Sequence, residues 1–155
     1  MFDEEWPDGP VVLGVGWDCS EHLIRTAVAL AGDLGQHLVC AFVDPASYLT
    51  EWEPAVQRTV LSLDPAINDE ADFPFKQLQR KLGCILGQPG ETWSFRVLNG
   101  DVSKALSRLA ESTGASLIIV GADRPGSLAC VDRTLEGSVS ASLTHQQRHP
   151  VLIIP

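Results

Sequence analysis

Five short apolar runs alternate along the chain with longer amphipathic stretches. Three of the runs are continuously hydrophobic, which is typical of strands buried on both faces of a sheet. The run at 93–98 alternates apolar and polar residues, and the run at 150–154 is flanked by prolines, so both are predicted to lie at sheet edges. The predicted strands are Val11–Trp17, His37–Val43, Trp93–Leu98, Ser116–Gly121 and Pro150–Ile154.

Apolar residues at helical spacing lie between these runs. A helix capped by Ser20 is predicted to end at Gly35, and a helix capped by Asp101 is predicted to end at Gly114. A third amphipathic helix is predicted to begin at Pro74, because proline is favoured at the first helical position.

The whole pattern fits a single α/β domain. Strands that alternate with helices form βαβ units and a parallel sheet. At 155 residues the chain has the usual size of one domain, and no linker or internal repeat divides it. We therefore expect one domain over 1–155, with an N-terminal extension at 1–10, an irregular segment at 46–73 and a weaker helix at 138–147.

Charge and composition exclude several functional classes. The formal net charge of −9 argues against nucleic acid and anionic membranes as partners, because both require clustered basic side chains. No apolar run approaches the ~20 residues of a membrane span, and no signal peptide is evident, so a cytoplasmic location is expected. The four cysteines include no C-x-x-C pair, which indicates a reducing compartment, no structural disulfide and no zinc site.

Several blocks of the sequence resemble the universal stress protein family. VVLGVGWDCSEHLIRTAVALA is similar to the family's first strand, acidic turn and first helix. FRVLNGDVSKALSRLAESTGASLIIVGADRPG, the GSV at 137–139 and the terminal HPVLII continue the match in order. The resemblance implies an open five-stranded parallel sheet of order 3-2-1-4-5 with helices on both faces. Such sheets bind ligands in a crevice outside the strand ends, here between strands 1 and 4.

The resemblance also implies an adenine-nucleotide site. Members that bind ATP carry G-x2-G-x9-G-[S/T] after strand 4, where glycines let the backbone approach phosphate and a helix N-terminus attracts anions. This chain departs from the pattern, because Arg124 replaces the second glycine and Pro125 removes an N–H group. The candidate nucleotide-binding residues are Asp18, Val43, Gly121, Arg124, Gly126, Gly137, Ser138 and Val139.

Two functions remain open at this point. The first is a stress-response regulatory protein that binds ATP, with Mg, in the crevice. The second is an ATP-independent interaction module whose crevice is degenerate or empty. Asp18 and Gly137-Ser138 favour the first function, and the altered glycine loop favours the second. The resemblance implies a homodimer through the last strand, where the apolar edge Val151–Ile154 needs a cover.

An enzymatic function has little support in the sequence. No nucleophile is paired with a base, so we expect at most slow ATP hydrolysis. Cys19 lies just before a helix N-terminus with His22 close by, an environment that lowers a thiol pKa. Without an oriented base and acid, we interpret Cys19 as a turn residue rather than a reactive thiol.

Overall fold

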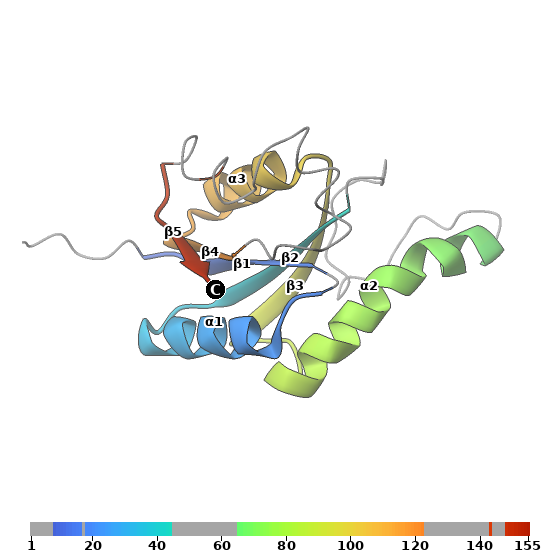
Figure 1. Ribbon diagram of the computed structural model, residues 1–155, viewed down its shortest axis with the longest axis horizontal. Helices are drawn as coiled ribbons and strands as arrows, with labels where there is room; N and C mark the ends of the chain where they lie inside the picture. Colours follow the sequence, from blue (N-terminus) through green and yellow to red (C-terminus); the bar gives the residue numbers. More distant parts are fainter. Residues whose placement is uncertain (1–7, 17, 45–64, 123–142, 144–147) are drawn as a thin grey trace, which may run out of the picture.

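The computed structural model describes residues 8–16, 18–44, 65–122, 143 and 148–155, and only the backbone of 65–75. Within these ranges the chain forms five strands and three helices (Figure 1). In chain order they are β1 (Val11–Val15), α1 (Glu21–Asp33), β2 (Leu38–Asp44), α2 (Pro65–Leu86), β3 (Trp93–Asn99), α3 (Val102–Thr113), β4 (Leu117–Gly121) and β5 (Val151–Ile154). None of these helices is long and apolar enough to cross a membrane.

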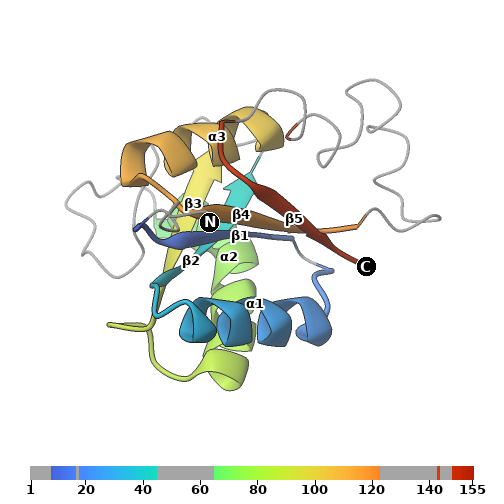
Figure 2. The same cartoon turned by 90° about the vertical axis from the view of Figure 1, so that its left-hand side faces the viewer.

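The five strands form one parallel sheet in the order β3-β2-β1-β4-β5. Helices α1 and α2 cover one face and α3 covers the other (Figure 2). The alternating strand β3 and the proline-flanked strand β5 occupy the two edges, as their patterns predicted. The predicted fold class is therefore confirmed.

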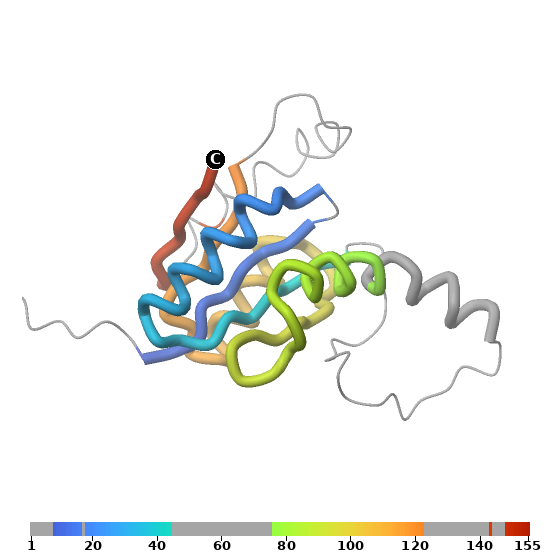
Figure 3. The backbone as a smooth tube through the Cα atoms, turned by 90° about the horizontal axis from the view of Figure 1, so that it is seen from below, coloured from blue at the N-terminus to red at the C-terminus, as the bar shows by residue number. Residues whose placement is uncertain are grey.

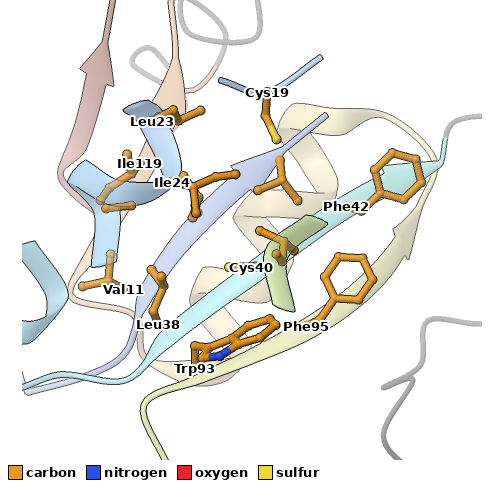
Figure 4. Packing of buried hydrophobic residues seen from close by; sticks show 14 of the residues in the cluster. Val11, Cys19, Leu23, Ile24, Leu38, Cys40, Phe42, Trp93, Phe95 and Ile119 are labelled. Carbon is orange, nitrogen blue, oxygen red and sulfur yellow. The ribbon is translucent and has the colours of Figure 1, made fainter. Parts of the chain in front are cut away.

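Successive residues of β1 enter two different cores. Val11, Leu13 and Val15 belong to the core under α1 and α2, whereas Val12 belongs to the core under α3. The first core also takes aromatic side chains from β2 and β3 (Figure 4). Because both faces of β1 are buried, apolar residues must follow one another without alternation, which explains the continuous run in the sequence.

The two predicted N-caps are confirmed. The Ser20 hydroxyl accepts a hydrogen bond from the Leu23 amide at 3.1 Å, and the Asp101 carboxylate accepts one from the Lys104 amide at 2.9 Å. Each cap supplies an acceptor for an amide that has no partner within its own helix.

The helix ends agree with the sequence at α1 and α3 but differ at the start of α2. Gly35 and Gly114 follow α1 and α3 with φ of +64° and +63°, a conformation that glycine adopts without strain. Helix α2 begins at Pro65 rather than at Pro74, so it includes the end of the segment 46–73 that we expected to be irregular. From the sequence alone either proline could stand in the first helical turn, and the pattern does not choose between them.

Two parts of the predicted elements lie outside the described residues. One is Trp17, which was expected to end the first strand. The other is the predicted helix at 138–147, of which only Leu143 is described. Leu143 is fully buried in the core under α3. The Leu143 side chain therefore packs against this face of the sheet.

Candidate functional site

The central strand β1 stops pairing with its two neighbours, β2 and β4, at different residues. Pairing between β1 and β2 continues to Val15 and Phe42. Pairing between β1 and β4 stops earlier, at Leu13 and Ile119, although β4 itself continues to Gly121 and stays paired with β5. We call this divergence of β1 from β4, between Leu13–Val15 and Ile119–Gly121, the strand fork. It lies where the strand order reverses, the place where open α/β sheets bind ligands.

The backbone of Val43 is directed to the β1 side of its strand. The Leu38 amide donates to the Thr92 carbonyl on the β3 side at 3.0 Å, and the His37 carbonyl accepts from the Val11 amide of β1 at 2.8 Å. Successive residues of a strand direct their N–H and C=O groups to opposite sides, so the odd-numbered residues of β2 face β1. Val43 therefore faces β1 at a level beyond the last β1–β2 pair.

The backbone of Gly121 faces β1 from the opposite side. The Ala122 amide donates to the Ile154 carbonyl on β5 at 2.7 Å, so the preceding residue, Gly121, directs its N–H and C=O toward β1. A Cβ atom at position 121 would lie 3.3 Å from Leu23 Cδ2 of α1. Glycine therefore lets α1 pack closely over the strand fork.

The turn after β1 places an exposed carboxylate at the same edge of the sheet. The Cys19 amide donates to the Gly16 carbonyl at 3.2 Å and closes the turn, and the exposed Asp18 lies within it. A Cβ atom at position 16 would lie 3.4 Å from Asp18 Oδ1, so the carboxylate lies beside the Gly16 backbone. Figure 3 shows the end of β1 beside the start of α1, the two elements that this turn connects.

The structure thus brings three of the candidate residues to the carboxyl ends of three adjacent strands. Asp18 follows β1, Val43 lies near the end of β2, and Gly121 ends β4. The remaining candidates lie outside the described residues and stay predictions: Arg124, Gly126, Gly137, Ser138 and Val139.

Sequence reasoning missed one side chain at this site. The Lys81 ammonium of α2 donates to the Cys19 carbonyl at 2.5 Å. Lys81 is next to the buried Leu82, at the border of the apolar stripe of α2. This position in the helix was the only sign in the sequence that the lysine could reach the sheet. The two residues are 62 positions apart, and only the packing of α2 against the sheet brings them together.

The Cys19 thiol is not activated. Only 8% of the residue is exposed, and burial raises the pKa of this thiol, although the nearby Lys81 ammonium partly opposes the increase. A thiol with a raised pKa stays protonated at neutral pH and is a poor nucleophile. This agrees with our interpretation of Cys19 as a turn residue.

Metal-binding residues are not clustered in this part of the chain. Among the described residues, no group of three or more His, Cys, Asp or Glu side chains could hold a metal ion.

Comparison with known proteins gives one family. The family model described as the universal stress protein family matches residues 9–155. No match was found among curated proteins. Many solved structures are similar across almost the entire chain, and three of them, at identities that show the fold alone, are described here.

The first of these structures is a universal stress protein in complex with cAMP, with 20% identity, a TM-score of 0.60, and coverage of 96% of this chain and 98% of that one. The second is an Archaeoglobus fulgidus protein in complex with dAMP, with 16% identity, a TM-score of 0.63, and coverage of 95% and 98%. The third is from Lactobacillus plantarum, with 18% identity, a TM-score of 0.61, and coverage of 96% and 99%.

Proposed function

The chain belongs to the universal stress protein family, and from that premise we propose that it is a stress-response regulatory protein that binds an adenine nucleotide at the strand fork. One observation carries the proposal: Val43 and Gly121 direct backbone polar groups toward the line of β1 from opposite sides, and the exposed Asp18 lies at the end of β1. Two structures of similar fold hold cAMP or dAMP, which share an adenine base and a sugar phosphate.

Each group at the strand fork suits one part of an adenosine. The edge of adenine has a donor amine next to an acceptor nitrogen, and the C=O of Val43 offers an acceptor for the amine. The Asp18 carboxylate can accept hydrogen bonds from ribose hydroxyls. The Gly121 backbone, which has no side chain, leaves room for the sugar phosphate to approach.

Phosphate recognition would come from the residues after β4. The net charge of −9 and the carboxylate of Asp18 both disfavour an anionic ligand, so phosphate needs local donors. We assign that role to Arg124, Gly126 and the predicted helix start at Gly137-Ser138-Val139. ATP is the proposed nucleotide, and its phosphates would hold most of the coordination of a bound Mg ion.

Thermal unfolding with added ligands tests the proposal. Adenosine, AMP, cAMP, ATP and ATP with Mg would each be added at millimolar concentration, with GTP as the base-specificity control. A ligand present at about 100 times its Kd stabilises the folded state by about 2.7 kcal/mol, which raises the melting temperature measurably. If none of the adenine ligands raises it, nucleotide binding is rejected.

Two matched variants assign the binding to the strand fork. Asp18→Ala should weaken adenosine binding, because the ribose hydroxyls lose their acceptor. Asp33→Ala makes the same charge change at the exposed far end of α1 and should leave binding unchanged. Equal losses of adenosine affinity in both variants would indicate a general effect of charge rather than contact with the ribose.

We further propose that the protein is a homodimer through β5. Leu152 and Ile153 are 37% and 41% exposed, and β5 ends the sheet among the described strands. An exposed edge that carries apolar side chains favours pairing with a second copy. Light scattering should give a dimer at micromolar concentration and a monomer for Ile153→Lys, with Glu111→Lys on α3 as the control. A monomeric wild-type protein would reject the dimer.

The second candidate function is an ATP-independent interaction module. The observation that favours it is Arg124-Pro125, which removes a glycine and an N–H group from the phosphate loop. Native mass spectrometry of freshly purified protein separates the two functions. Retained adenine nucleotide supports the first, and bare protein that also fails to respond to added ligand supports the second.

A further inference from the structure

The turn that carries Asp18 depends on a contact from outside its own segment. The Cys19 carbonyl lies just before the helix cap, and the Leu23 amide, which would be its nearest helical donor, instead donates to the Ser20 hydroxyl at 3.1 Å. The carbonyl of Ser20 accepts from Ile24 at 3.3 Å. The Cys19 carbonyl therefore needs a donor from elsewhere, because the cost of leaving a partly buried carbonyl unpaired is high.

Lys81 supplies that donor from a firmly anchored helix. Its ammonium donates to the Cys19 carbonyl at 2.5 Å in a part-buried, charge-assisted hydrogen bond. Leu78 and Leu82, on either side of Lys81 in the helix, are both buried in the core under α1 and α2. Figure 3 shows α2 passing close to the end of β1, so the lysine reaches the turn from a fixed backbone.

Two hydrogen bonds restrain Cys19, the residue that follows Asp18. The Cys19 amide is bonded to Gly16 within the turn, and the Cys19 carbonyl is bonded to Lys81 across it. The charges of Lys81 and Asp18 also shift the pKa of the Cys19 thiol in opposite directions, which places both charges close to this residue. The lysine is thus bonded to the backbone of the turn that carries Asp18.

We propose that Lys81 is a positioning residue of the nucleotide site, which holds the turn after β1 through the Cys19 carbonyl and so directs Asp18 toward the ribose. This inference rests on the proposed function, since it assumes that Asp18 meets a ribose. It separates two roles that a lysine near an anionic ligand can have. A positioning lysine affects adenosine and ATP alike, whereas a lysine that attracts phosphate affects ATP alone.

Titration calorimetry with adenosine and with ATP tests the proposal. Lys81→Met should lower the affinity for adenosine and for ATP by the same factor, about 10-fold for the loss of one charge-assisted hydrogen bond. Lys81→Arg keeps a charged donor and should recover part of the affinity. The control is Lys76→Met, an exposed lysine of the same helix, which should bind like the wild type.

A double-mutant cycle shows whether Lys81 acts through Asp18. In an Asp18→Ala background, Lys81→Met should reduce adenosine affinity by less than about 2-fold, because the group that it positions is already absent. If the losses of adenosine affinity in Asp18→Ala and Lys81→Met were fully additive in the double variant, the proposal would be overturned. A loss confined to ATP, or an equal loss in the Lys76→Met control, would also overturn it. If Lys81→Met does not fold, Lys81→Gln retains a neutral donor and allows the same cycle.

Hydrogen exchange of the turn gives a readout that does not depend on ligand. The Cys19 amide should exchange faster in Lys81→Met than in the wild type, while amides in α3 should be unchanged. Unchanged exchange at Cys19 would overturn the positioning role even if nucleotide binds. If wild-type protein binds neither adenosine nor ATP, the proposed function and the ligand role of Lys81 both fall, and the exchange rate still decides whether Lys81 holds the turn.

Discussion

Replacement of Asp101 by alanine should destabilise the protein by about 1 kcal/mol, because it removes the N-cap of α3. The Asp101 carboxylate accepts hydrogen bonds from the Lys104 amide at 2.9 Å and from the Ser103 hydroxyl at 2.7 Å. Alanine leaves both donors without this acceptor. Losses at such caps range from about 0.5 to 2 kcal/mol, and partial access of water to this end of α3 favours the middle of the range.

Urea unfolding followed by circular dichroism at pH 7 measures this loss. Asp101→Asn keeps an acceptor at the cap and should remain within about 0.5 kcal/mol of the wild type. Glu111→Ala, an exposed change in the last turn of α3, should also lie within about 0.5 kcal/mol. If Asp101→Ala unfolds at the same urea concentration as these controls, the cap does not contribute as the structure indicates.

The same cap predicts a pH dependence with a definite sign. The hydrogen bonds from the Lys104 amide and the Ser103 hydroxyl hold the pKa of Asp101 below its ordinary value of 3.8. The extra stability of the ionised carboxylate is therefore fully present above pH 3.8 and is lost as the pH falls through the folded-state pKa. The stability difference between wild type and Asp101→Ala should be constant from pH 7 to about 5 and shrink below 3.8. A difference that grows in acid would contradict this reasoning.

Two further predictions concern the packing of β1 and the accessibility of the cysteines. Gly14→Ala should destabilise the protein by about 1–3 kcal/mol in thermal unfolding, because the new Cβ would lie 3.1 Å from Cδ1 of the buried Leu106; an unchanged melting temperature would mean that this core adjusts freely. In a Cys130→Ser background, the exposed Cys84 should react with a thiol reagent in the native state, whereas Cys40, whose pKa is raised to about 12 by burial, should react only after unfolding. Fast labelling of Cys40 in native protein would show that its strand is accessible.

The strands were the most predictable part of this molecule. Each of the five apolar runs forms a strand, and in the described residues the ends of each strand lie within two residues of the predicted ends. The central strands were predictable because strands covered on both faces need unbroken apolar sequence. The caps at Ser20 and Asp101 were equally clear, because a short polar side chain before an apolar stripe has few other roles. Both signals are local in the sequence.

The features that were missed are those that depend on distant contacts. Pro65 and Pro74 carry the same local signal, and the helix begins at Pro65 and continues through Pro74. The bond from Lys81 to Cys19 joins residues 62 positions apart, and no pattern near either residue announces it. The crevice between strands 1 and 4 was expected from the family resemblance, but the residues at which β1 and β4 stop pairing, Leu13 and Ile119, were not.

At the strand fork, Val43 and Gly121 contribute main-chain atoms, and the direction of those atoms is set by the position of each residue along its strand. Alanine scanning would pass over such positions, because replacing a side chain leaves the peptide groups in place. A one-residue insertion or deletion early in β2 would turn the peptide groups of Val43 toward β3 and away from the fork. The main-chain recognition that we propose would tolerate wide divergence in side chains but very little change in strand length.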